Sequence, residues 1–477
     1  MTNKTNELAR SRETLFAPVA GAQIAPRLFG ARSASSMSPP VTIDGSSLEG
    51  GGQIVRVAAA LAAVTGRETR VERVRANRPK PGLAAQHLAG LHLCARACGG
   101  RCADGDRDDD APPAVGSRAF VLTPGSPARF AERNAPSGGT AAASPSRLRA
   151  DVGTAGATTL VAQAALSPLL YALRPTELRL TGGTDVPMAP PLGYLLHVLA
   201  PLLRRHALCS VDCAVAARGY YPLGGGDATL AIAPPTDPSA FPLPPLTIER
   251  TRPCRGGDRE PAKLGCWIVD PRAAEGDHRR AKVLAQAALR AAVSESPSLA
   301  FAADAMASAG VPVDVGTKTE PSGGGSGGGK GRSKSEANAE GSSSGGGSVV
   351  VTASSPDGVV VLGAARTFAS GASDADRIRA SAEAGKELAA TMESGAAVDD
   401  HALDQLVVHM ALADGRGGRR SRVVARSPVS SHAKTAMAIC ERACGATFYA
   451  REGEEGGVGE GLVAIECVGI GAEPRKE

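Results

Sequence analysis

Residues 43–56 carry the sequence IDGSSLEGGGQIVR, which joins a short apolar strand at Val41–Ile43 to a helix with an apolar face. Three consecutive glycines between a strand and a helix let the backbone approach a ligand and offer N–H groups to a phosphate. The same triplet would also suit a plain tight turn. Glu49 beside it has two interpretations, a ligand for a divalent cation or a favourable charge at the helix N-terminus. No Gly-Lys-Ser/Thr follows, so this is not a Walker loop.

The alternation of strand and helix continues on both sides of this turn. We expect further strands at 69–75, 119–122, 176–180, 422–426 and 462–468, and helices at 83–98, 156–170, 190–206, 374–392, 402–413 and 432–444. Strand–helix units repeated several times predict an α/β protein built by internal duplication.

Several segments interrupt the repeated units. Residues 104–113 and 134–149 are expected to be loop expansions, the first acidic and the second rich in Ser, Pro and Ala. A small α/β domain is predicted at 252–350, with strands at 266–269 and 311–315, a helix at 278–293 and a Gly/Ser-rich linker at 322–347. The body is then 39–251 and 351–477, and residues 1–38 are a disordered or targeting extension.

The composition limits the classes of function. Aromatic residues make up only 3%, which argues against an RNA-binding sheet that stacks bases on Phe, Tyr and Trp. The net charge of +5 permits a polyanionic partner without requiring one. No apolar run is long enough to span a membrane, so we expect no membrane partner. The ten cysteines form no Cys-x-x-Cys pair and are expected to be buried residues in a reducing compartment.

A histidine is predicted in the first turn of the last long helix. In the run Ser427–His432, Ser430 or Ser431 would cap the helix and place His432 at its start. The positive end of the helix disfavours a charged ring, which leaves a neutral nucleophile beside N–H groups that can hold a phosphate. A single histidine at such a position is also compatible with a purely structural role.

Two further runs are candidates for binding. Residues 75–82, RANRPKPG, place three cations in a turn stiffened by prolines, followed by Gln86 and His87. Fixed arginines suit a phosphate, although an ordinary basic turn has the same composition. Residues 218–226, RGYYPLGGG, lie between two expected strands, and their pattern alone favours a hairpin or bulge.

Together with GTAG at 153–156, GGTD at 182–185 and DQL at 404–406, these runs occur in the order found in RNA 3'-terminal phosphate cyclases. The chain resembles that family over about residues 41–470, apart from the loop expansions and the linker. The resemblance implies repeated βαβ units similar to those of 5-enolpyruvylshikimate-3-phosphate synthase, with a small inserted α/β domain.

The resemblance also implies roles for individual residues. His432 corresponds to the adenylylated histidine, and Glu49 to a carboxylate that binds metal and triphosphate. Nucleotide-binding positions correspond to Arg56, Gln163, Pro190, His401, Asp404 and Gln405. Positions that contact phosphate and the RNA end correspond to Arg75, Arg78, Gln86 and His87, with Arg56 again. The family pattern has an adenine-stacking Tyr where this chain has His401, and residues 416–421 are additional, so we expect weaker ATP binding.

The implied activity is ATP-dependent conversion of an RNA 3'-phosphate end to a 2',3'-cyclic phosphate, through His–AMP and RNA–pp–A intermediates. It requires ATP and Mg²⁺ or Mn²⁺, and its partners are RNA 3'-phosphate ends. One alternative is a catalytically inactive cyclase-like protein of ribosome biogenesis, which would lack the histidine. Another is a small-molecule transferase on the related synthase fold. The expected compartment is the nucleus (nucleoplasm), with the cytoplasm or an organelle as alternatives.

Overall fold

The structure is a computed structural model. It describes residues 40–107, 109–125, 145–206, 208–235, 237–250, 263–270, 279–300, 314–318 and 345–474. The expected extension at 1–38 therefore lies outside the described residues, as do 134–144 of the second predicted loop and 322–344 of the predicted linker.

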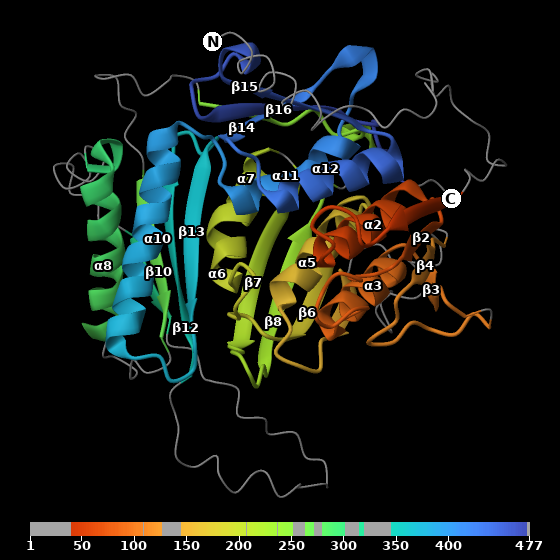
Figure 1. Ribbon diagram of the computed structural model, residues 1–477, viewed down its shortest axis with the longest axis horizontal. Coiled ribbons are helices and arrows are strands. Elements are labelled where there is room, and N and C mark those ends of the chain that lie inside the picture. Colours follow the sequence, from red (N-terminus) through yellow and green to blue (C-terminus); the bar gives the residue numbers. More distant parts are fainter. Residues whose placement is uncertain are drawn as a thin grey trace, which may run out of the picture. The chain divides into compact units, whose positions relative to one another are not determined.

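The first repeat is a four-stranded sheet with two helices (Figure 1). Its elements are β1 (Val41–Asp44), α2 (Gly52–Thr65), β2 (Thr69–Glu72), α3 (Ala85–Ala97), β3 (Arg101–Asp104) and β4 (Phe120–Thr123). The strand order is β1-β2-β4-β3, in which the first pair is parallel and the others are antiparallel. Helix α2 forms as the sequence predicts: its apolar residues are buried, and Gly66 ends it with a φ of 71° that favours glycine.

The second repeat has the same topology. Its elements are β5 (Ser146–Asp151), α5 (Thr158–Leu170), β6 (Thr176–Gly182), α6 (Leu192–Tyr194), η2 (Leu195–Leu199), α7 (Ala200–Arg205), β7 (Ser210–Ala217) and β8 (Gly226–Ala233), with a short 3-10 turn η3 (Pro238–Ala240) after it. The strand order is β5-β6-β8-β7, again with one parallel and two antiparallel pairs. The end of the predicted loop 134–149 was therefore wrong, because residues from Ser146 onward form β5. The Ser, Arg and Ala residues of β5 concealed an alternation of buried and exposed positions.

The third repeat is interrupted. It consists of β9 (Thr247–Ile248), α11 (Asp400–Leu412), η5 (Arg416–Gly418), β14 (Ser421–Arg426), α12 (Ser431–Cys444), β15 (Thr447–Glu452), η6 (Gly453–Gly456) and β16 (Leu462–Val468). The order β9-β14-β16-β15 repeats the parallel–antiparallel–antiparallel pattern. Three sheets of one topology confirm an α/β fold of repeated units, and the additional residues 416–421 form the η5 turn and the start of β14.

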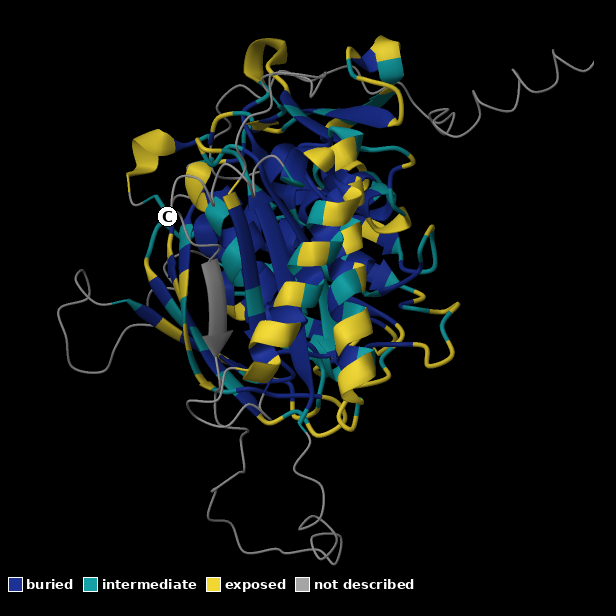
Figure 2. Cartoon of the chain, turned by 90° about the vertical axis from the view of Figure 1, so that its left-hand side faces the viewer, coloured by how far each residue is buried: buried dark blue, intermediate teal, exposed yellow. Residues whose placement is uncertain are grey.

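The inserted unit lies between β9 and α11 and is larger than predicted. It contains β10 (Lys263–Val269), α8 (Arg279–Glu295), β11 (Asp314–Lys318), β12 (Gly347–Ser354), β13 (Val361–Phe368) and α10 (Asp374–Ser394). Its sheet has the order β11-β10-β12-β13, and α8 and α10 pack together against it (Figure 1). Figure 2 shows both helices with a buried inner face and an exposed outer face.

The predicted boundary at 350 needs correction because it falls inside β12, a central strand of this sheet. The linker prediction extended too far for the same reason, since Gly347 begins β12 and pairs with Phe368. The Gly/Ser composition runs directly into the strand and hides its start. The strand predicted at 311–315 is β11, described from Asp314 onward.

The helices of the three repeats lie between the sheets and carry the core. Helix α2 packs against α3, α5 and α12, and α11 packs against α12 (Figure 1). Among the described residues, no helix has the length and apolar character needed to cross a membrane.

Candidate active site

The predicted site residues come mainly from the beginnings of helices in the three repeats. Arg56 lies in α2, Gln86 and His87 in the first turn of α3, and Pro190 just before α6. His401 and Asp404 lie in the first turns of α11, and His432 in the first turn of α12. Helix N-termini present free N–H groups and a partial positive charge, so helices that begin near one site favour an anionic ligand.

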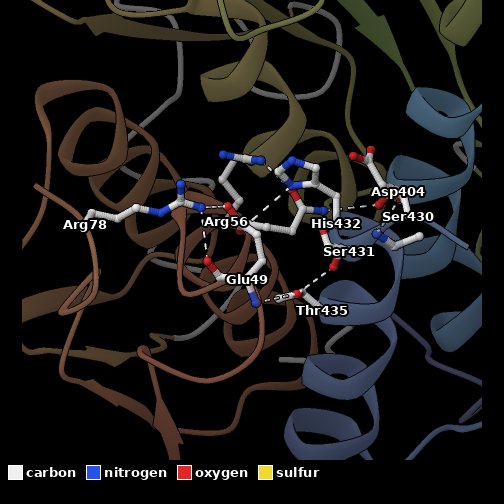
Figure 3. A network of polar contacts seen from close by, with 10 residues as sticks. Glu49, Arg56, Arg78, Asp404, Ser430, Ser431, His432 and Thr435 are labelled. Carbon is white, nitrogen blue, oxygen red and sulfur yellow. Dashed lines mark hydrogen bonds and ion pairs between the residues drawn. The ribbon is translucent and has the colours of Figure 1, made fainter. Parts of the chain in front are cut away.

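His432 lies where the sequence predicts, at a capped helix start. The Ala433 amide donates to Ser430 Oγ at 3.1 Å, which identifies Ser430 as the capping residue. The His432 side chain is 53% exposed, and its Nδ1 lies 3.8 Å from Glu49 Oε2 (Figure 3). This distance is too long for a hydrogen bond, so both atoms remain available to a ligand. Residues almost four hundred positions apart in the chain thus form one site.

Glu49 is held in place by contacts on several sides. Arg78 forms an ion pair with the Glu49 carboxylate and also donates to the Glu49 carbonyl oxygen at 3.0 Å. The Glu49 amide donates to Thr435 Oγ1 at 3.3 Å, and Thr435 in turn donates to Ser431 O at 2.7 Å (Figure 3). These contacts connect the glycine-rich turn, the basic turn and α12.

One oxygen of this carboxylate is unpaired. Glu49 Oε2 is buried and has no hydrogen-bond partner among the residues that the structure describes. A buried unpaired carboxylate oxygen is costly, and a cation would satisfy it. No described group of three or more His, Cys, Asp or Glu side chains could hold a metal ion by itself. A Mg²⁺ or Mn²⁺ ion would therefore fit here only if phosphate oxygens and water supplied its remaining ligands.

Four of the predicted nucleotide residues lie near the junction of α2, α5 and α11: Arg56, Gln163, Asp404 and Gln405. Arg56 is hydrogen-bonded to Gln53 Oε1, and Gln53 Nε2 donates to Asp404 O at 3.4 Å. A pocket at this junction is lined in part by Arg56, Gln163 and Gln405. Arg56 Nε is a second buried atom without a partner among the described residues.

Burial controls the charges in this region. It lowers the pKa of Arg56, and it raises the pKa of Asp404 to about 7 although His401 and Arg56 act in the opposite direction.

The start of α11 is fixed by Asp399, a buried residue that the sequence analysis did not single out. Asp399 Oδ1 accepts hydrogen bonds from the His401 and Ala402 amides, each at 3.1 Å, and from the Tyr194 hydroxyl at 2.6 Å. Its Oδ2 accepts from the Gly363 amide in β13 at 3.0 Å. Asp399 therefore links the second repeat and the inserted unit to the helix that carries His401 and Asp404. The aspartates before His401 match an N-cap, which was the available sequence signal.

His401 follows Asp399 in the chain, and Pro190 comes shortly before Tyr194, which donates a hydrogen bond to Asp399. The His401 ring meets the Tyr194 ring edge-on, with centroids 5.7 Å apart and planes at 80°. Pro190 precedes α6, which contains Tyr194, and its carbonyl accepts from Thr159 Oγ1 at 2.8 Å. The aromatic ring beside His401 is therefore that of Tyr194, a residue that the sequence patterns did not assign to the site.

The residues predicted to contact phosphate and RNA surround Glu49 and the start of α3. Arg75 Nη1 donates to Gly82 O at 2.9 Å and closes the basic turn whose Arg78 reaches Glu49. The buried ring of His87 accepts from the Ala84 amide through Nδ1 at 3.1 Å. Burial, with Arg56 and Arg75 nearby, lowers the pKa of His87 to about 3, so it is neutral at physiological pH.

Gln86 makes the contact that joins α3 to the second repeat. Its Oε1 accepts from the Ala157 amide at 2.8 Å, directly before α5.

The run 218–226 is the connection between β7 and β8, as its pattern indicated. The buried Arg218 pairs with Asp185 at 3.1 Å, and Ser348 of β12 donates to the same carboxylate at 2.7 Å. A Cβ at Gly219 would overlap Gly182 O, so only glycine fits there. These contacts join the second repeat to the inserted unit and give Arg218 and Gly219 a structural role.

Comparisons with known proteins give one family for this chain. The family model described as RNA 3'-terminal phosphate cyclase matches residues 47–450. The chain is 44% identical over 195 residues to an RNA 3'-terminal phosphate cyclase of Archaeoglobus fulgidus, covering 41% of this chain and 52% of the relative. It is 42% identical over 221 residues to that of Halobacterium salinarum, covering 46% and 56%, and 38% identical over 191 residues to that of Methylococcus capsulatus, covering 40% and 48%. The chain thus spans about half the length of the curated relatives that it matches.

Proposed function

Since this chain belongs to the RNA 3'-terminal phosphate cyclase family, we propose that it is an ATP-dependent enzyme that converts an RNA 3'-phosphate end to a 2',3'-cyclic phosphate. Its partners are then ATP and RNA 3'-phosphate ends, and the reaction releases AMP and pyrophosphate. The observation that carries the proposal is the half-exposed His432 at the start of α12, next to the unpaired Oε2 of Glu49.

The first step is transfer of AMP to the protein. Glu49 faces His432 Nδ1, which leaves Nε2 as the nitrogen whose lone pair attacks the α-phosphorus of ATP. The new bond is P–N, and the bond to pyrophosphate breaks. The start of α12 offers N–H groups to the phosphate, while Arg56 and Arg78 supply positive charge close to it.

A divalent cation at Glu49 would neutralise charge on the triphosphate as pyrophosphate departs. In this proposal Glu49 Oε2 holds that cation and Arg78 holds the other carboxylate oxygen in position.

The remaining steps involve the RNA end. An oxygen of the RNA 3'-phosphate attacks the phosphorus bound to His432, so the P–N bond breaks and an RNA–pp–A end forms. The oxygen of the neighbouring 2'-hydroxyl then attacks the 3'-phosphorus, its proton passes to solvent, and the bond from that phosphorus to the bridging oxygen breaks, so that AMP leaves. Ring closure is intramolecular and forms a five-membered ring, which lowers its entropic cost. Arg75 and the Arg78 turn are the proposed contacts for the RNA phosphate.

The experiment that tests the proposal incubates the protein with α-labelled ATP and Mg²⁺, followed by a denaturing gel. We expect a labelled protein whose bond is acid-labile and alkali-stable, as for a phosphoramidate. His432→Ala should carry no label, whereas Ser431→Ala should, since Ser430 is the capping residue. Label on His432→Ala would remove this residue from the mechanism. No label on the wild-type protein would favour the inactive ribosome-biogenesis alternative.

A second assay tests the order of the steps. An RNA with a 2'-deoxy 3'-phosphate end should accept AMP and then stall as RNA–pp–A, because its 2'-hydroxyl is missing. An RNA with a 3'-hydroxyl end should accept nothing, and adenylylation of that end would contradict the substrate assignment. For the compartment, the nucleus remains our proposal on the family resemblance alone, and imaging of a fluorescent fusion would test it against cytoplasm and organelle.

A further inference from the structure

Large exposed apolar side chains occur on two loops of the second repeat. Met188 is 97% exposed, Tyr221 is 61% exposed and Leu223 is 90% exposed. Single exposed apolar residues are common, but grouped ones often mark a binding surface. Met188 lies between β6 and α6, and Tyr221 and Leu223 lie between β7 and β8. We call these three residues the apolar rim.

The two loops leave the same end of the second sheet. The last residue of β6, Gly182, pairs with Gly226, the first residue of β8. Beyond this pair, Asp185 bridges to Tyr220, and the Thr184 amide donates to Gly219 O at 2.9 Å. The apolar rim is therefore built from adjacent backbone segments, although Met188 is more than thirty positions from Tyr221 and Leu223 in the chain.

The same end of the sheet leads to the candidate active site. Gly224 packs closely against Ala155 in the turn before α5, where a Cβ added at Gly224 would lie 3.0 Å from the Ala155 Cα. Two residues later, the Ala157 amide donates to Gln86 at 2.8 Å. Gln86 is followed by His87, which lies against Gly52 at the start of α2. A continuous series of contacts thus connects the rim to the residues that surround Glu49.

The loops that carry the rim are firmly held. The buried ion pair between Asp185 and Arg218 joins the two loops to each other. Met188 has a φ of 65°, a left-handed conformation that costs energy for any residue except glycine. A bulky side chain at a strained and almost fully exposed position contributes little to folding, which favours a role in binding.

We propose that the apolar rim binds the unpaired bases that precede the 3'-phosphate of the RNA. This inference rests on the proposed function. Bases of single-stranded RNA stack on aromatic side chains, such as the exposed Tyr221, whatever their sequence. The phosphates of the same strand carry negative charge, and the basic turn with Arg75, Arg78 and Lys80 precedes Gln86 in the chain and reaches Glu49 through Arg78. The rim would hold the bases while the basic turn holds the terminal phosphate.

The test measures binding of a short fluorescent single-stranded RNA with a 3'-phosphate, without ATP. A second RNA has abasic residues in place of its last three bases. The test protein combines Tyr221→Ser and Leu223→Ser. The control combines Val283→Ser and Ile378→Ser, which remove exposed apolar side chains from α8 and α10 of the inserted unit. Thermal unfolding checks that every variant is folded.

For the natural RNA we expect the dissociation constant to rise on the order of tenfold in the rim variant and to stay unchanged in the control. The abasic RNA should bind the wild-type protein on the order of tenfold more weakly, and the rim variant should bind both RNAs equally. Unchanged affinity in the rim variant would overturn the inference. Equal losses for both RNAs would also overturn it, because the rim would then not contact bases. If the rim variant and the abasic RNA both show the expected losses of affinity but the wild-type protein forms no cyclic phosphate, the inference holds and the proposed function fails.

Discussion

Replacement of Asp399 by asparagine tests how the start of α11 is held. The buried carboxylate accepts hydrogen bonds from the Tyr194 hydroxyl, from the His401 and Ala402 amides, and from the Gly363 amide. Asparagine keeps one acceptor oxygen, but its NH₂ group replaces the other. If the oxygen stays with the cap, the NH₂ group faces the Gly363 N–H, and two donors meet.

The loss of stability expected for Asp399→Asn follows from these contacts. An unpaired buried amide costs about 1–3 kcal/mol, and loss of charge weakens the remaining hydrogen bonds by about 1 kcal/mol in total. We therefore expect Asp399→Asn to lower the free energy of unfolding by about 2–4 kcal/mol. Tyr194→Phe removes one of the four hydrogen bonds and should cost about 1–2 kcal/mol. Asp400→Asn, at the exposed next position, is the matched control and should cost under about 1 kcal/mol.

Urea unfolding measures the stability, and labelling by α-labelled ATP at increasing concentrations measures nucleotide affinity. Asp399→Asn should weaken ATP binding more than the control does, because His401 and Asp404 follow the cap on α11. If Asp399→Asn and Asp400→Asn have the same stability and the same ATP dependence, the carboxylate does not position this helix, and the reasoning is refuted.

Three further predictions use other parts of the structure. A Cβ at Gly52 would overlap the His87 ring, so Gly52→Ala should lower the free energy of unfolding by about 1–3 kcal/mol and weaken RNA binding. Urea unfolding and RNA titration measure these two effects. Wild-type values for both would contradict the prediction. Because burial raises the pKa of Asp404 to about 7, the folded protein retains a proton between about pH 4 and 7 that the unfolded chain loses, and stability should fall as pH rises through this window. Asp404→Asn should remove that part of the slope of urea midpoint against pH, and an unchanged slope would oppose the assignment. Deletion of residues 322–344 should leave the melting temperature nearly unchanged. Deletion of residues 322–347 should lower the melting temperature, because β12 then loses its first residue, Gly347. Equal melting temperatures for the two deletion variants would contradict this prediction.

Sequence patterns predicted the helices of the repeated units better than the strands. The apolar faces of α2 and α12 and the glycine that ends each one made these helices recognisable. Strands with small or charged residues escaped prediction, and β5 is an example, because its exposed positions are Arg147, Arg149 and Asp151 and its buried ones include Ser146 and Ala150. The C-terminal limit of the inserted unit was also misplaced, because β12 and β13 complete its sheet and α10 packs on it, although all three follow the Gly/Ser-rich segment.

The features that could be predicted from the sequence are local ones. The glycines after Glu49 and a serine cap at Ser430 or Ser431 depend on neighbours within a few residues, and their chemistry follows from residue type. The choice of Ser430 as the cap, the 3.8 Å between Glu49 Oε2 and His432 Nδ1, and the lack of a hydrogen-bond partner for that oxygen among the described residues appear only in the folded structure. Only it decided that Asp399 joins three parts of the chain. Such contacts depend on how separate repeats pack, and packing energy is shared among many residues far apart in sequence, so no single segment encodes it.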